Sequence, residues 1–182
     1  MNAPLYNRSS EIGDQAILNV DWAVKYWISK GAPREKIMLG LGTYGRTFRL
    51  ANAVNNKPGD ASTGPGSVGK YTGESGFMSY YEICDKISQG WTRVWEPEHK
   101  VPYIYNGNEW VGYDDTQSLT EKVAYIKKEG LGGAMFWALD LDDFTGTFCG
   151  QGKYPLINFV KSQLQSSIPQ KDHPSNDVGS RN

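Results

Sequence analysis

Residues 132–144, GGAMFWALDLDDF, decide the predicted fold of this chain. Two glycines open the stretch and a continuous apolar run follows, which is the pattern of a parallel β-strand covered on both faces. Side chains at the carboxyl ends of such strands form the active sites of α/β barrels. The stretch therefore predicts a buried strand that brings Trp137, followed by three aspartates, to a functional edge.

An earlier segment predicts a second strand of the same kind. Residues 16–30 have apolar side chains at helical spacing, and Gly31 ends this pattern, so we expect an amphipathic helix there. A short apolar strand follows within residues 36–42. A helix followed by a buried strand is half of a β/α repeat, which favours an α/β fold.

The region between the two predicted strands has a different character. Residues 52–69 are rich in Gly, Pro, Asn and Ser and predict a long loop, whereas residues 78–87 predict a helix. Residues 92–113 predict short antiparallel strands, with a hairpin turn at Asn106-Gly107. Residues 47–115 are therefore expected to form a small α+β unit inserted between two strands of the main sheet.

The last part of the chain predicts helices on either side of the Trp137 strand. Residues 118–129 predict a helix with Ser118 as its cap and Glu121 completing a capping box. Residues 154–165 predict a closing helix with a proline near its first turn. The polar composition of residues 166–182 predicts a disordered tail or linker.

Composition argues against several classes of function. The 19 basic and 20 acidic residues give a net charge of −1, so we expect no nucleic-acid partner. No apolar run approaches the roughly 20 residues of a membrane span, and Met1 opens onto polar sequence without the pattern of a signal peptide. The sequence contains no glycine-rich phosphate loop and no zinc-binding pattern, so neither a cofactor nor a metal is expected.

Several other residues have roles that spacing alone leaves open. Cys84 and Cys149 are too few to establish a disulfide framework, so buried thiols and a bridge both remain possible. Asn7 begins an N-R-S glycosylation sequon in a polar segment. His99 and His173 lie in polar sequence without a partner at ligand spacing, and both are expected to be solvated.

Seven short segments occur together in an order that resembles the family 18 chitinases. They are NAPLY (2–6), GAP (31–33), GTYGR (42–46), ESG with YYEIC (74–76 and 80–84), VPY (101–103), WVGYD (110–114) and TFC (147–149). The resemblance covers about residues 1–165 and implies part of a (β/α)8 TIM barrel. Residues 1–46 and 116–165 are expected to supply its last two strands and flanking helices, and residues 47–115 its inserted domain.

The resemblance also implies a function. The parent protein resembles a secreted, monomeric, endo-acting chitinase that cleaves β-1,4-linked N-acetylglucosamine by substrate-assisted, retaining hydrolysis. The family's catalytic D-x-x-D-x-D-x-E is absent from this chain, and its acid glutamate is expected upstream of Met1. A chitinase-like lectin that binds without hydrolysis is the alternative, and a gene fragment or a non-enzymatic product is another.

The resemblance places five residues at positions that contact substrate. Trp137 matches the tryptophan at the floor of the family's cleft, although an ordinary core tryptophan is the alternative. Tyr44 and Arg46 can offer hydrogen bonds to sugar hydroxyls and an acetamido group, or can brace the inserted domain. Glu74 and Phe77 can face the cleft, or can be a solvated carboxylate and a core ring.

The resemblance further implies that Cys84 and Cys149 pair in a disulfide, which indicates an extracellular location. The aspartates Asp140, Asp142 and Asp143 invite an acid/base or metal interpretation. Carboxylates at a junction between a strand and a loop more often cap backbone amides, and the family does not take its acid from this segment. We therefore expect a capping role for them.

Overall fold

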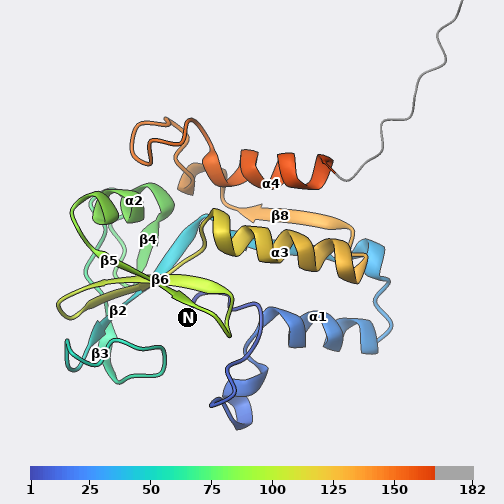
Figure 1. Cartoon of the computed structure of the whole chain (residues 1–182), viewed down its shortest axis with the longest axis horizontal. Coiled ribbons are helices and arrows are strands. Elements are labelled where there is room, and N and C mark those ends of the chain that lie inside the picture. Colours follow the sequence, from blue (N-terminus) through green and yellow to red (C-terminus); the bar gives the residue numbers. More distant parts are fainter. Residues whose placement is uncertain (167–182) are drawn as a thin grey trace, which may run out of the picture.

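The computed structural model describes residues 1–166. The predicted tail, 166–182, lies outside these residues apart from Ser166, and so does His173. Within residues 1–166, no helix is long and apolar enough to cross a membrane. Helices and two separate sheets make up the described chain, which confirms the α/β class (Figure 1).

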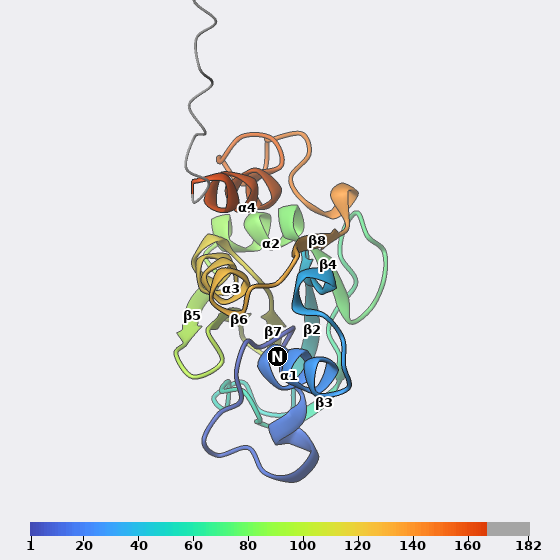
Figure 2. The ribbon, with the colours of Figure 1, turned by 90° about the vertical axis from the view of Figure 1, so that its right-hand side faces the viewer.

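The first sheet consists of two parallel strands, β1 (Met38–Gly42) and β8 (Gly133–Trp137). Their buried side chains pack toward the helices α1 (Val20–Ser29), α3 (Thr116–Glu129) and α4 (Pro155–Gln165). Helix α3 lies between α1 and α4 in both views (Figure 1 and Figure 2). The predicted pair of strands with flanking helices is therefore present.

The prediction that the Trp137 strand is buried on both faces is wrong for the described chain. Leu39 and Leu41 of β1 are buried, but Met135 and Trp137 of β8 are 46% and 67% exposed. Alternate side chains of a strand point to opposite faces. Because only β1 and β8 pair in this sheet among residues 1–166, nothing covers the second face.

The second sheet is antiparallel and lies at the other end of the molecule with helix α2 (Tyr80–Ser88) (Figure 1). Its main path runs in the order β3-β2-β7-β6-β5, and β4 pairs with the other end of β2. The strands are β2 (Tyr44–Leu50), β3 (Ser62–Pro65), β4 (Phe77–Ser79), β5 (Thr92–Glu96), β6 (Val101–Asn106) and β7 (Glu109–Gly112).

Most of the expected elements in this region occur. The hairpin joins β6 to β7, with Asn106 opposite Glu109 and Gly107 at a positive φ of 56° that glycine adopts readily. The prediction of one long loop over 52–69 missed β3, because a strand of four Ser, Thr, Gly and Pro residues has no apolar alternation. Helix α2 begins at Tyr80 rather than at residue 78, because β4 extends to Ser79.

The predicted cap of α3 is wrong. The cap is Asp115, whose carboxylate accepts from the backbone amides of Gln117 and Ser118. The Ser118 hydroxyl lies three residues inside the helix and accepts from the Asp115 amide, which completes the capping box in the reverse order. Ser118 also donates to the buried Asp114 carboxylate at 2.7 Å.

Helix α1 is shorter than the predicted 16–30. A 3-10 turn over Gly13–Ile17 precedes it, and Asn19 caps the helix by accepting from the Trp22 amide at 2.8 Å. An asparagine cap ends the helical hydrogen bonding on its amino-terminal side, which the apolar spacing did not reveal. The closing helix α4 occurs as expected, with Pro155 as its first residue.

Candidate functional site

The carboxyl ends of β1 and β8 are held together at the point where Trp137 emerges. Gly42 lies opposite Trp137 in the parallel register. The next residue, Thr43, donates its amide to the Trp137 carbonyl at 3.2 Å and its hydroxyl to the Ala138 carbonyl at 2.6 Å. Since Thr43 is fully buried, these two bonds fix the backbone that presents the exposed indole.

Tyr44, Arg46 and Phe77 form a stack next to this edge. Tyr44 and Arg46 alternate along β2, and Arg46 pairs with Phe77 of β4. The two rings stack with centroids 5.0 Å apart, and the Arg46 guanidinium lies 5.5 Å from one centroid and 5.4 Å from the other. The stack therefore presents two aromatic rings and a cation on one side of β2.

Gly42 connects the stack to Trp137. A Cβ built on Gly42 would lie 3.2 Å from Cε1 of Tyr44, so the tyrosine ring lies against the backbone of this glycine. Because Gly42 is also the register partner of Trp137, the tyrosine and the tryptophan flank the same short segment of β1. Their surroundings form an open face, on which Met135, two positions before Trp137 in β8, is also exposed.

The fifth predicted contact residue is not part of this stack. Glu74 is exposed in the turn before β4, and within residues 1–166 its carboxylate makes no hydrogen bond or ion pair. Asn7, the predicted glycosylation site, is also exposed, and its amide donates to the Arg8 carbonyl at 3.1 Å.

The sequence reasoning missed two residues that position the site. Asn2 is buried, and its side-chain amide donates to the Tyr44 carbonyl at 3.1 Å. Thr43 joins β1 to β8 as described above. Both belong to segments that carried the family resemblance, NAPLY and GTYGR, and this was the available signal. Their contacts join residues more than forty positions apart, so spacing could not reveal them.

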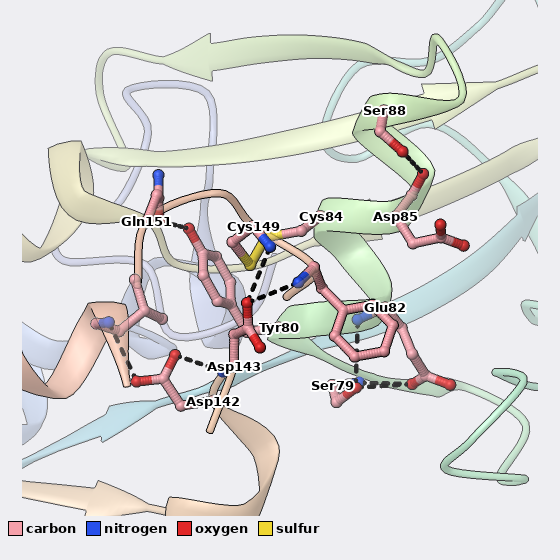
Figure 3. The surroundings of a disulfide bond; sticks show 12 residues. Ser79, Tyr80, Glu82, Cys84, Asp85, Ser88, Asp142, Asp143, Cys149 and Gln151 are labelled. Atoms are coloured by element: carbon pink, nitrogen blue, oxygen red, sulfur yellow. Dashed lines mark hydrogen bonds between the residues drawn. A yellow bond between two sulfur atoms is a disulfide. The ribbon is translucent and has the colours of Figure 1, made fainter. Parts of the chain in front are cut away.

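Two of the three aspartates after Trp137 cap backbone amides, as expected. The buried Asp142 carboxylate accepts from the amides of Leu156 and Ile157, at the start of α4 (Figure 3). The buried Asp143 carboxylate accepts from backbone amides within residues 146–149. Asp140 is exposed. In the described part of the chain, no cluster of His, Cys, Asp or Glu could hold a metal ion.

The two buried carboxylates differ in electrostatics. Burial raises the pKa of Asp142 above its ordinary value, and the amide bonds only partly offset this effect. Burial acts in the same direction on Asp143, but the hydrogen bonds from the backbone amides outweigh it and hold its pKa below the ordinary value. Since both side chains already bind amides, neither is free to act on a substrate.

Cys84 and Cys149 form a disulfide, with sulfur atoms 2.09 Å apart (Figure 3). The bridge expected from the resemblance is therefore present. It joins α2 to the loop that follows β8, and the Asp143 carboxylate holds the amide of Cys149 in that loop at 2.9 Å. The Tyr80 hydroxyl, 3.2 Å from the Gln151 side chain, adds a second link between the same elements.

His99 is not solvated, which corrects the prediction. Its side chain is buried and its Nε2 lies 2.9 Å from the Glu11 carboxylate. Burial lowers the pKa of His99, although the nearby Glu11 opposes this shift. The surrounding sequence is polar, but the residues after β5 fold back against the amino-terminal segment, where the His99 carbonyl accepts from the Leu5 amide.

Comparison with known proteins identifies the family of this chain. Residues 1–142 match the family described as "Glycosyl hydrolases family 18". Mouse chitotriosidase-1 is 48% identical over 168 residues, which cover 90% of this chain and 34% of that protein. A solved structure of human YKL-39, described as a pseudo-chitinase with retained chitooligosaccharide binding properties, is 46% identical with a TM-score of 0.87.

That YKL-39 match covers 90% of this chain and 44% of the human chain. An immunomodulatory active chitinase from Trichuris suis is 43% identical with a TM-score of 0.87, over 90% of this chain and 45% of that one. The chain thus spans 34–45% of the length of these three proteins. On the match over residues 1–142, the chain belongs to glycosyl hydrolase family 18.

Proposed function

We propose that this chain forms part of the substrate cleft of a secreted chitinase-type domain that binds β-1,4-linked N-acetylglucosamine chains. In this proposal residues 1–46 and 116–165 form the last two strands of a TIM barrel with their helices. Residues 47–115 form the inserted domain beside the cleft. The parallel pairing of β1 with β8 and the separate antiparallel sheet support this division.

The exposed indole of Trp137 is the observation that carries the proposal. In the described chain the Trp137 ring is 67% exposed at the carboxyl end of β8, across Gly42 from Tyr44 of the stack, so it is available to a ligand there. The apolar C–H face of a pyranose ring can pack on it and bury area on both partners. Tyr44 and Phe77 continue the aromatic surface, and Arg46 adds N–H donors for hydroxyl or acetamido oxygens.

In this proposal the chain supplies binding groups, and the proton donor comes from elsewhere. The catalytic D-x-x-D-x-D-x-E is absent from its sequence, and Asp142 and Asp143 are occupied by backbone amides. In a substrate-assisted mechanism the N-acetyl oxygen attacks the anomeric carbon while a glutamate protonates the leaving oxygen. That glutamate would come from the rest of the barrel.

A chitinase-like lectin is the second candidate. Human YKL-39 is described as a pseudo-chitinase that retains oligosaccharide binding, whereas the Trichuris suis relative is described as an active chitinase. Both possibilities use the same aromatic face, so they differ only in the residues that donate the proton. The Cys84–Cys149 disulfide supports an extracellular location for either, because such bridges persist in oxidising compartments.

Replacing Trp137 with alanine should weaken chitotetraose binding by about ten- to a hundredfold, since it removes a stacking surface. Calorimetric titration of the chain measures the affinity. Trp27→Ala is a matched control, because Trp27 is 62% exposed on α1 and lies away from this face. Unchanged affinity for Trp137→Ala, or an equal loss for Trp27→Ala, would contradict the proposed contact.

The chain on its own is expected to bind chitotetraose without hydrolysing a fluorogenic chitobioside. The physical reason is the missing proton donor, which leaves the leaving oxygen unprotonated. Fluorescence release is measured beside a family 18 enzyme as the positive control. Turnover that a single substitution within this chain abolishes would show that the chain contains its own acid.

A further inference from the structure

A groove far from Trp137 in the chain lies between α1 and the segment that precedes it. It has a volume of about 350 Å³, within the range typical of small-molecule sites. An aromatic wall can pack against the apolar face of a sugar ring, and polar side chains beside it can bind the hydroxyls. The groove is lined by Asn7, Ala16, Asn19, Asp21, Trp22, Lys25, Tyr26 and Ser29.

The aromatic wall of this groove faces away from the protein core. Val24 is the buried residue of α1, and Val20 and Ile28 on either side of it pack against the core. Trp22 and Tyr26 are each two positions from Val24, which places them about 160° around the helix. They are 40% and 45% exposed, and their rings stack with centroids 5.1 Å apart. Neither ring belongs to the hydrophobic core, although the Lys30 ammonium group lies 5.3 Å from the centroid of Tyr26.

The glycosylation sequon opens onto the same groove. Its middle residue, Arg8, is anchored by a hydrogen bond to the Pro58 carbonyl and lies 4.0 Å from Glu96. The flanking residues Asn7 and Ser9 are exposed, in a segment without helix or strand. The Asn7 side chain that a glycosyltransferase must reach is therefore accessible, and Arg8 next to it holds the backbone in place.

We propose that Asn7 carries an N-linked glycan and that its first N-acetylglucosamine lies in this groove against Trp22. The bond between Nδ2 of Asn7 and the anomeric carbon forms as the bond from that carbon to the pyrophosphate of a lipid-linked donor breaks. The pyrophosphate keeps the electron pair, and Nδ2 loses a proton to solvent. The inference rests on the secretory part of the proposed function but not on chitin binding.

Covalent attachment explains why a shallow groove is enough to hold the first sugar of the glycan. A tethered sugar has an effective concentration in the millimolar range, so one stacking contact and a few hydrogen bonds can hold it. Lys25, whose ammonium group pairs with Asp21 at 2.8 Å, is exposed at the groove and offers a donor to sugar hydroxyls. Free chitin would need to bind the same groove without this advantage.

The first experiment measures the fraction of molecules that carry a glycan on Asn7. The full chain is expressed behind a heterologous secretion signal in cultured mammalian cells, and the peptide that contains Asn7 is analysed by mass spectrometry. Both the secreted and the cell-retained pools are measured. We expect a glycan on most molecules, its loss in Ser9→Ala, and its retention in Ser9→Thr. An Asn7 that is mostly unmodified in both pools overturns the proposal, whereas chitotetraose binding tests the proposed function separately.

The contact with Trp22 is tested by the rate at which a peptide N-glycosidase removes the glycan from the native protein. Trp22→Ala should speed removal about tenfold, because it frees the first sugar, and Trp22→Phe should stay close to wild type. Trp27→Ala is the control, since Trp27 does not line the groove. Equal rates for wild type and Trp22→Ala overturn the proposed contact.

A comparison without any variant completes the test. Hydrogen exchange in α1 is measured on wild-type protein before and after enzymatic removal of the glycan. Slower exchange with the glycan present is expected, because the sugar covers the outer face of the helix. Identical exchange in the two forms overturns the proposed location of the sugar, whatever the occupancy of Asn7.

Discussion

Replacing Lys122 with methionine is expected to lower the free energy of unfolding by about 3–5 kcal/mol. Nζ of Lys122 lies 2.7 Å from each carboxylate oxygen of Asp114, and both side chains are buried. Among residues 1–166, the substitution leaves the buried Asp114 charge with the Ser118 hydroxyl as its one remaining side-chain partner. An uncompensated buried charge costs far more than the net contribution of the intact pair. Urea denaturation measures the change.

Two further variants separate charge burial from simple loss of packing. Adding Asp114→Asn to Lys122→Met removes the stranded charge and should restore much of the lost stability. Lys25→Met is the matched control, because the Lys25–Asp21 pair has the same 2.8 Å contact on the surface of α1. Its loss should cost less than about 1 kcal/mol. A Lys122→Met variant as stable as Lys25→Met would mean that the buried pair is not held as described.

The sequence could not reveal this buried pair. Lys122 lies within a helix with many polar residues, where a lysine is normally solvated, and eight positions separate it from Asp114. The pair arises because only residues 113–115 separate β7 from α3, and Asp114 in this short link reaches Lys122 on the buried side of the helix. Such a contact depends on how a strand and a helix pack together. Neither hydrophobic spacing nor residue composition predicts that packing.

Sequence patterns predicted the elements whose structure depends on neighbouring residues in the chain. The apolar run before Trp137 gave the strand β8, and Asn106-Gly107 gave the turn between β6 and β7. The exposure of Trp137 could not be read in the same way, because burial depends on which other strands cover the sheet. His99 shows the same limit, since it is buried against the distant amino-terminal segment, where it contacts Glu11.

For the candidate site, Tyr44 and Arg46 are two positions apart, a spacing that puts side chains on one side of a strand, and the structure stacks them with Phe77. What alternation could not give was the connection to Trp137 through Gly42 and Thr43, which links two strands remote in sequence. The family resemblance assigned Tyr44, Arg46 and Trp137 to substrate contact but gave no contact between them.

Removing the Cys84–Cys149 bridge is expected to lower the free energy of unfolding by about 4 kcal/mol. The cysteines are 65 positions apart, so the bridge closes a long loop and restricts the unfolded chain strongly. The bridge also ties α2 to the loop after β8, whose backbone amides bind Asp143. Changing both residues to alanine removes the bond without leaving a free thiol or an unpaired hydroxyl.

The measurement is urea denaturation of the double alanine variant beside the wild type, with non-reducing peptide mapping to show the pair in the wild type. Wild-type protein treated with a reductant is the second comparison, because it loses the bridge while keeping both sulfur atoms. Both forms should lose similar stability if loop closure is the main cause. A large loss in the alanine variant alone would assign the effect to packing of the sulfur atoms. Free thiols in protein from an oxidising secretory pathway would contradict the bridge itself.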